Sequence, residues 1–140
     1  MASTPRLLAF AGSLRSDSFN KKLVRIAAQG AEAAGAQATF IDLRDYSLPI
    51  FDEDLERDQG TPENARKLKD LFKSHQGLLI ASPEYNSSIT AVLKNTLDWV
   101  SRPATGEAPL AAFDGKVAAL MAASPGALGG LRGLVTVRSI

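Results

Sequence analysis

Hydrophobic residues along the chain gather in short runs of strand length, and longer amphipathic stretches separate these runs. The runs that predict strands are Arg6–Ala11, Ala38–Leu43, Gly77–Ala81 and Lys116–Met121. The stretches between them repeat apolar residues at helical spacing, which is typical of helices packed on one side. Strands that alternate with such helices indicate successive βαβ units around a parallel sheet, so the expected fold class is α/β.

Each helix is expected to bury one apolar face against the sheet. The first covers Asn20–Ala34, and the second begins with Thr61 as N-cap and Pro62 as its first helical residue. A third helix ends before Pro103, and a last helical segment covers Ala127–Ile140. The side chains expected to point inward from the first two helices are Leu23, Ile26, Ala27, Ala31, Ala65, Leu68, Leu71 and Phe72.

Composition narrows the possible functions. The 140 residues are 45% hydrophobic and 22% charged with a net charge of +1, which fits one globular domain and argues against nucleic acid as a partner. No apolar run is long enough to span a membrane, and Met1–Arg6 lack the apolar core of a signal peptide, so we expect a cytoplasmic protein without membrane association. Since the chain has no cysteine, any redox chemistry must come from a bound cofactor.

The turn after the first predicted strand carries groups that suit a phosphate. Serine hydroxyls and backbone N–H groups can donate to phosphate oxygens, Arg15 can add a bidentate contact, and the following helix N-terminus favours negative charge. The turn lacks both G-x-G-x-x-G and the Lys-Ser/Thr pair of a Walker loop, so a monophosphate fits best. The alternative is that its serines and asparagine only cap the helix.

The turn after the third predicted strand, S-P-E-Y-N-S-S at residues 82–88, combines a rigid proline, an aromatic ring and several hydrogen-bonding groups. Backbone amides of such a turn can meet the polar edge of a planar heterocycle, while Tyr85 covers its apolar surface. The alternative is an ordinary strand-to-helix turn with Ser87 or Ser88 as N-cap.

Two motifs together resemble the NADPH-dependent FMN reductase family, which includes quinone, chromate and azo reductases. They are G-S-L-R-x-x-S-x-N at residues 12–20 and S-P-E-Y-N-x-S-x-x-x-x-L-K-N-x-x-D-W at residues 82–99, and the likeness runs from about Leu7 onward. The resemblance implies one flavodoxin-like FMN-binding domain over residues 1–140, a three-layer αβα sandwich with strand order 2-1-3-4. The cofactor-binding residues that it implies are Ser13, Arg15, Ser18 and Asn20 for the phosphate, Pro83, Glu84, Tyr85 and Asn86 for the ring, and Ser124 and Gly126 to complete the pocket.

The same resemblance implies an NAD(P)H-dependent oxidoreductase. FMN would take a hydride from NADPH or NADH and pass electrons to a flavin, a quinone or a similar small-molecule acceptor in ping-pong order. No catalytic side chain and no metal are expected, because the flavin carries the chemistry. A flavin-binding electron carrier without nicotinamide activity and a non-catalytic flavodoxin-like protein are the alternatives. Family analogy suggests a homodimer or a homotetramer.

Three further features have simple structural explanations. We expect His75, the only histidine, to be solvated at the end of the second helix. We expect the acidic residues 52–54, in the long loop Arg44–Gly60, to be solvated rather than to bind a metal. Trp99 is expected to be buried on a helix face rather than stacked on the cofactor, and Asn95 and Asp98 to serve helix packing or subunit contact.

The end of the chain departs from the family pattern, because the family's sheet has five strands and this chain ends where the fifth would begin. We therefore expect the fourth strand to form an exposed edge. Apolar surface on the third and fourth strands should be uncovered on the side of the first helix. Two hypotheses account for this gap: a truncated protein, or a partner subunit over the bare surface.

Overall fold

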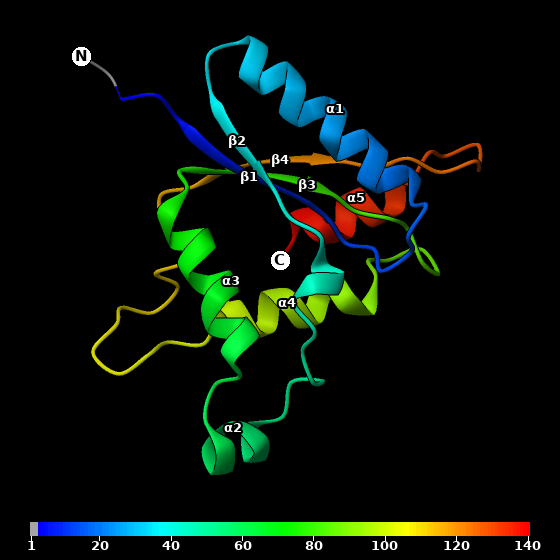
Figure 1. Cartoon of the computed structure of the whole chain (residues 1–140). Coiled ribbons are helices and arrows are strands. Elements are labelled where there is room, and N and C mark those ends of the chain that lie inside the picture. Colours follow the sequence, from blue (N-terminus) through cyan, green and yellow to red (C-terminus); the bar gives the residue numbers. More distant parts are fainter. Residues whose placement is uncertain (1–2) are drawn as a thin grey trace.

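The predicted strands form one four-stranded parallel sheet (Figure 1). The computed structural model describes residues 3–140. The strands are β1 (Arg6–Ala11), β2 (Gln37–Phe40), β3 (Gly77–Ala81) and β4 (Val117–Met121). They pair in the order β2-β1-β3-β4, and every pairing is parallel, which confirms the expected order.

Helices cover the two faces of the sheet unequally. Figure 1 shows α1 (Phe19–Ala33) on one face and α3 (Glu63–Ser74), α4 (Ala91–Ser101) and α5 (Leu131–Arg138) on the other. The short helix α2 (Glu53–Gln59) and the 3₁₀ turn η1 (Leu43–Asp45) lie in the connection from β2 to α3. Of the helices in the described part of the chain, none combines the length and apolar character that crossing a membrane requires.

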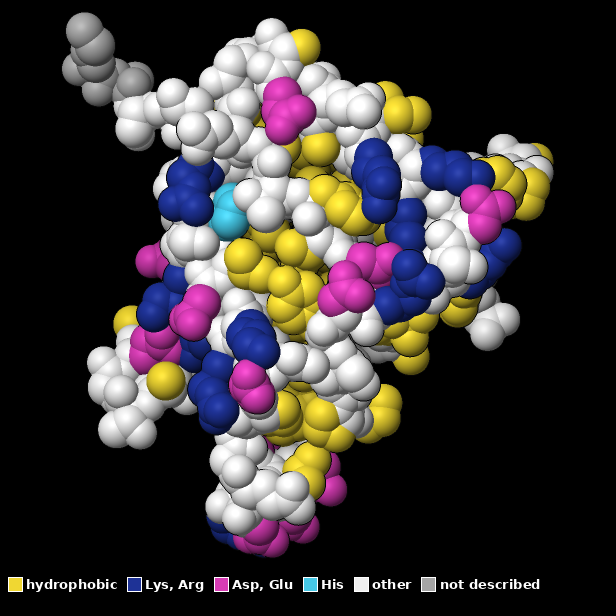
Figure 2. All heavy atoms as spheres, in the orientation of Figure 1, with side chains coloured by type: hydrophobic (Ala, Val, Ile, Leu, Met, Phe, Trp, Pro, Cys, Tyr) yellow, Lys and Arg dark blue, Asp and Glu magenta, His cyan; other side chains and the backbone are white. Residues whose placement is uncertain are grey.

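The main hydrophobic core lies between the sheet and the helices α3 and α4. There the rings of Phe10 and Phe72 pack with centroids 5.5 Å apart. On the opposite face, small residues such as Ala9 and Ala81 let α1 lie close to the sheet and bury Val24. Figure 2 shows hydrophobic side chains reaching the surface in the middle of one face, with charged side chains on both flanks.

The fourth strand leaves apolar surface open, as expected. Val117 is 77% exposed and Ala119 is exposed too, although both lie in the sheet. On the side of α1, Leu79 and Met121 are only partly buried. Within residues 3–140 the sheet thus ends at β4 with an uncovered edge.

The buried face of α1 differs from the prediction. Ile26 is 65% exposed, while Val24 and Lys21 are buried. The apolar residues of this alanine-rich helix lie on several sides, so their spacing does not select one face. A long-range contact selects the buried face instead, because the Lys21 ammonium pairs with the Asp42 carboxylate at 2.9 Å. Asp42 also caps η1, which ends β2 at Phe40 rather than at residue 43.

The prediction for His75 was wrong, since this side chain is only 2% exposed. Its Nδ1 lies 2.7 Å from the carbonyl oxygen of Leu71, and its Nε2 lies 3.0 Å from the hydroxyl of Thr39. The ring therefore joins the end of α3 to β2. The prediction for Trp99 is confirmed, because the indole is 1% exposed and donates to the Pro49 carbonyl at 2.8 Å.

Most other boundaries differ by a few residues. The bounds of β1 and β3 agree with the prediction, whereas α3 begins at Glu63 with Pro62 in the N-cap position. The last helix begins only at Leu131, because Gly129 and Gly130 both adopt a positive φ that interrupts a helix.

The carboxylate of Glu107 joins α3 to the connection between α4 and β4. The Glu107 side chain pairs with Lys69 and with Lys73, the latter at 2.5 Å, and it accepts from the Ala104 N–H at 3.0 Å. Hydrogen bonds from Lys69, Lys73 and that N–H lower the pKa of Glu107 from 4.5 to about 2. The folded state therefore gains stability from ionised Glu107 above pH 4.5 and loses it as the pH falls toward 2.

The Glu107→Gln variant should lower the melting temperature at neutral pH by about 3 °C or more, because it leaves two ammonium groups without their carboxylate. Its melting temperature should also fall less steeply between pH 4.5 and pH 2 than that of the wild type. The matched control is Glu63→Gln, which removes an exposed pair with Lys67 on the same helix. Identical acid profiles for wild type and Glu107→Gln would refute this explanation.

Candidate functional site

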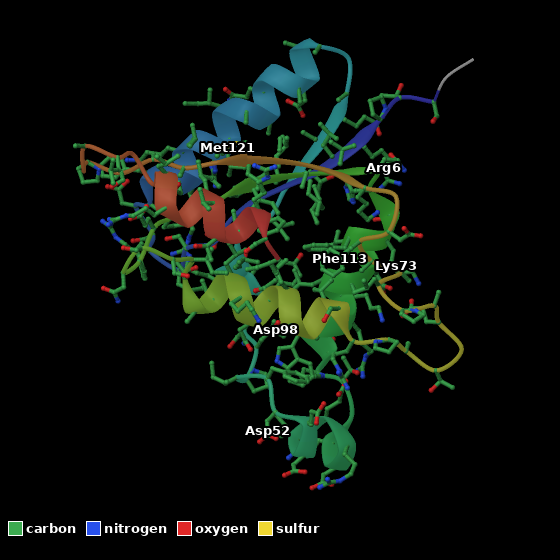
Figure 3. All side chains as sticks on the ribbon, turned by 180° about the vertical axis from the view of Figure 1, so that it is seen from behind. Arg6, Asp52, Lys73, Asp98, Phe113 and Met121 are labelled. Atoms are coloured by element: carbon green, nitrogen blue, oxygen red, sulfur yellow. The ribbon has the colours of Figure 1, made fainter. Side chains whose placement is uncertain are left out.

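The turns that follow β1, β3 and β4 meet at the carboxyl edge of the sheet and line one cavity of about 130 Å³. In Figure 3, Met121 marks this edge and Arg6 lies at the opposite end of the sheet. The residues that line the cavity are Ser13, Arg15, Ser18, Phe19, Asn20, Pro83, Glu84, Tyr85, Ala123, Ser124 and Pro125. Eight of the ten residues implied by the resemblance are among them, and Asn86 and Gly126 are not.

The first turn presents hydroxyl and cationic groups beside the N-terminus of α1. Ser13 and Ser18 are buried, and the Ser13 hydroxyl accepts from the Arg15 N–H at 3.3 Å. Ser18 is the N-cap of α1 and accepts from the Lys21 N–H at 3.4 Å, so it caps the helix and lines the cavity at once. Within the described part of the chain Arg15 forms no salt bridge, which leaves its guanidinium for an anion.

Asn20 joins the first turn to the turn after β4. Its side-chain oxygen accepts from the Ala123 N–H at 3.0 Å, and its Nδ2 donates to the Ala123 carbonyl at 3.0 Å. The amide thus makes a pair of hydrogen bonds with one backbone unit 103 residues away. Asn20 lines the cavity, but its side chain holds two of the cavity's walls together.

The turn after β3 is a tight two-residue hairpin. Tyr85 and Ser88 exchange backbone hydrogen bonds of 2.9 and 3.0 Å, and Asn86 and Ser87 adopt φ of 50° and 67°. Two successive positive φ values are typical of a type I′ turn. It holds Tyr85, which is 51% exposed, at the rim of the cavity. The N-cap of α4 is Thr90, so neither serine of this turn caps the helix.

The carboxylate of Glu84 is directed at the N-terminus of α5. It accepts from the backbone N–H groups of Arg132 and Gly133, both at 3.1 Å, and from Nε of Arg132 at 2.8 Å. The Gly133 N–H, followed by the Arg132 contacts, holds the pKa of Glu84 below its usual range. The carboxylate is therefore ionised at neutral pH.

The turn after β4 closes the cavity from a third side. Ser124 lines it, and the Ser124 hydroxyl accepts from the Gly126 N–H at 3.1 Å. Gly126 itself is exposed and shapes the turn from outside the lining.

A second cavity of about 430 Å³ adjoins the first, and the two share Ser13, Arg15 and Tyr85. The sequence did not predict most of the residues that line this second cavity. Leu14, Ala91 and Val92, for example, carry no polar group that would indicate a binding site. An apolar leucine within a polar turn was the available signal. The residues that line this cavity are Gly12, Ser13, Leu14, Arg15, Tyr85, Thr90, Ala91 and Val92.

Gly12 lets α4 pack closely against the end of β1. A Cβ atom at position 12 would lie 2.8 Å from Cβ of Leu93 and 3.2 Å from the Thr90 hydroxyl. The Thr90 hydroxyl instead donates to the Gly12 carbonyl at 2.7 Å. The glycine thus lets α4 lie directly against the end of β1.

The acidic loop has a local structural role. Asp52 is the N-cap of α2 and accepts from the Asp54 N–H at 2.8 Å, while Arg57 pairs with Asp54 at 2.6 Å. Within residues 3–140 no three histidine, aspartate or glutamate side chains come together as a metal site.

Comparison with known proteins shows that the chain is similar to a family of reductases. The family model described as NADPH-dependent FMN reductase matches residues 5–140. A 2-hydroxy-1,4-benzoquinone reductase from Burkholderia sp is 40% identical over 124 residues, which cover 89% of this chain and 63% of the relative. An NAD(P)H-dependent FMN reductase from Pseudomonas aeruginosa is 36% identical over 135 residues, which cover 94% of this chain and 66% of the relative.

Solved structures agree with the sequence comparison. The flavoenzyme NAD(P)H:(acceptor) oxidoreductase FerB from Paracoccus denitrificans superimposes with a TM-score of 0.79 at 32% identity. The match covers 97% of this chain and 70% of that structure. The chain spans only part of the two curated relatives named above, 63% and 66% of their length.

The Gly12→Ala variant should lower the free energy of unfolding by about 1–3 kcal/mol, because the added methyl forces α4 away from β1. Gly30→Ala is the control, since a Cβ at that helical position meets nothing within 4 Å, and it should stabilise the protein by about 0.5–1 kcal/mol. Urea unfolding followed by circular dichroism measures both values. Equal stabilities for the two variants would contradict the packing role of Gly12.

Proposed function

The chain belongs to the NADPH-dependent FMN reductase family, and from this we propose that it binds one FMN at the carboxyl edge of its sheet. FMN bound there would pass electrons from NADPH or NADH to a second small molecule. Two of the relatives are named as a 2-hydroxy-1,4-benzoquinone reductase and an NAD(P)H-dependent FMN reductase. A flavin, a quinone or a similar flat acceptor is the proposed oxidant.

The observation that supports this proposal most strongly is the phosphate-sized group of donors at the start of α1. The hydroxyls of Ser13 and Ser18, the guanidinium of Arg15 and the first N–H groups of a 15-residue helix face one cavity. The only carboxylate in the lining, that of Glu84, is engaged by α5 and does not oppose an anion. The residues present therefore fit the monophosphate of FMN.

The neighbouring cavity fits the flat part of such a ligand. Leu14, Tyr85 and Val92 offer apolar surface next to the phosphate donors, and aromatic rings cover planar heterocycles well. When bound, FMN supplies the hydride and electron transfer itself, so the chain needs no nucleophile or general base. The residues bind and orient, and the rim at Tyr85 admits donor and acceptor in turn. We expect ping-pong kinetics for this reason.

Location and assembly are proposals of the same kind. A protein without cysteine that uses NADPH or NADH suits the cytoplasm, where these co-substrates occur. The uncovered apolar side chains, such as Val117 and Val135, favour a homodimer or a homotetramer. Sedimentation equilibrium tests the proposed homodimer or homotetramer, and a monomer at micromolar concentration would contradict this proposal.

The activity is tested by mixing the purified protein with FMN and adding NADPH or NADH without oxygen. Binding should shift the visible flavin band, and the nicotinamide should bleach it faster than it bleaches free FMN. Bound flavin that keeps its colour would support an electron carrier instead. No binding of FMN would contradict the proposal.

The Arg15→Ala variant should weaken FMN binding by about tenfold or more, because it removes a charge-assisted contact with the phosphate. The control is Arg25→Ala, which removes an exposed arginine of α1 that packs on Phe40 of β2 and does not line the cavity. Fluorescence titration of FMN measures both dissociation constants. Riboflavin, which lacks the phosphate, should bind wild type and Arg15→Ala alike, and an equal loss for both flavins would contradict a phosphate contact.

A further inference from the structure

Helix α5 has no N-terminal cap of its own. Its N-cap residue is Gly130, which has a φ of 90° and no side chain, and no local side chain accepts from the first turn. The carboxylate of Glu84 takes this place from 48 residues earlier in the chain by accepting from the N–H groups of Arg132 and Gly133. The cap of α5 is thus supplied by the turn after β3.

Helix α5 packs closely against the turn after β3 at Gly133. A Cβ atom at position 133 would lie 3.2 Å from Cβ of Glu84 and 3.3 Å from the carbonyl oxygen of Ser88. A side chain at position 133 would crowd the turn, so glycine favours this close approach of α5. The Glu84 side chain is 9% exposed, and its hydrogen bond with the Gly133 N–H is partly buried.

Glu84 lines the cavity together with Pro83 and Tyr85, while its carboxylate accepts hydrogen bonds from the start of α5. Movement of this carboxylate would move the hairpin at residues 85–88 and the start of α5 together. The loop before α5 also carries Ala123 and Ser124 of the cavity wall. One side chain therefore sets the spacing of two walls of the cavity.

We propose that Glu84 is a positioning residue for the flavin, acting through the N-terminus of α5 rather than by contact with the cofactor. This inference rests on the proposed function. The carboxylate holds the hairpin and the loop after β4 at the separation that a flat ring requires. Loss of the carboxylate then weakens FMN binding and changes the surroundings of the ring without unfolding the sheet.

Comparison of two variants separates this role from that of a surface salt bridge. The Arg132 side chain is 57% exposed, and Arg132→Ala removes the ion pair but leaves both backbone N–H groups on Glu84. This variant should change FMN affinity by at most about fivefold, as for exposed ion pairs. Glu84→Ala removes the bonds to the backbone and should weaken FMN binding by about tenfold or more.

Glu84→Gln tests the same point by rescue. The glutamine side-chain oxygen can still accept from the N–H groups of Arg132 and Gly133, although it cannot pair with the guanidinium. We expect this variant to bind FMN within about fivefold of the wild type. The absorption spectrum of the bound flavin should match the wild type for Glu84→Gln and Arg132→Ala and differ for Glu84→Ala.

The experiment titrates FMN into the whole chain and its three variants and records the dissociation constant and the spectrum of the bound flavin. Hydrogen exchange of the Arg132 and Gly133 amides is followed in parallel without flavin, and it should be faster in Glu84→Ala only. Wild-type affinity and spectrum in Glu84→Ala would overturn the inference, and so would unchanged amide exchange.

Failure of the proposed function gives a different result, because the wild type itself would then not bind FMN. If Glu84→Ala does not fold, Glu84→Asp replaces it, since the shorter side chain cannot reach both N–H groups in the same way. Weaker FMN binding by Glu84→Asp than by Glu84→Gln supports the inference. The reverse order overturns it.

Discussion

Parallel pairing of the strands is the constraint on which the candidate site depends. Because β1, β3 and β4 run in the same direction, the chain leaves all three at one edge of the sheet. The pairing continues for one step beyond the strands. Gly12 donates to the Ala81 carbonyl at 2.9 Å, and Ser82 donates to the Met121 carbonyl at 2.8 Å. The first residues of the turns after β1 and β3 are therefore fixed by the sheet, and turns far apart in the sequence meet around one cavity.

Side-chain contacts between the turns complete the arrangement. Asn20 binds the backbone of Ala123, Thr90 binds the carbonyl of Gly12, and Glu84 binds the start of α5. The neutral hydrogen bonds of Asn20 and Thr90 each contribute about 0.5–1.5 kcal/mol net, so each is modest alone. Together with the bonds of Glu84, they connect the turns around the cavity to one another and to the helices α4 and α5. Asn20 and Glu84, two of the residues implied as cofactor ligands, thus line the cavity and also make contacts that hold its surroundings together.

The sequence predicted the features that depend on local pattern. The bounds of β1 and β3 agree with the structure, because each is a short apolar run within polar or turn-forming residues. The turns of the candidate site were found from their polar groups and from the family motifs. The local sequence pattern could not predict contacts between residues that lie far apart in the chain. The burial of Lys21 requires Asp42, that of His75 requires Thr39, and the direction of Glu84 requires a helix 48 residues away.

The central claim is that the turns after β1, β3 and β4 form one FMN site. Backbone amide NMR spectra of the labelled chain, recorded during titration with FMN, test it most directly. We predict that shifts and line broadening concentrate in residues 12–20, 83–88 and 122–126, at the carboxyl edge of the sheet. Amides at the opposite edge, near His75 and Lys116, should stay unchanged. Changes confined to one turn, or centred on that opposite edge, would contradict the claim.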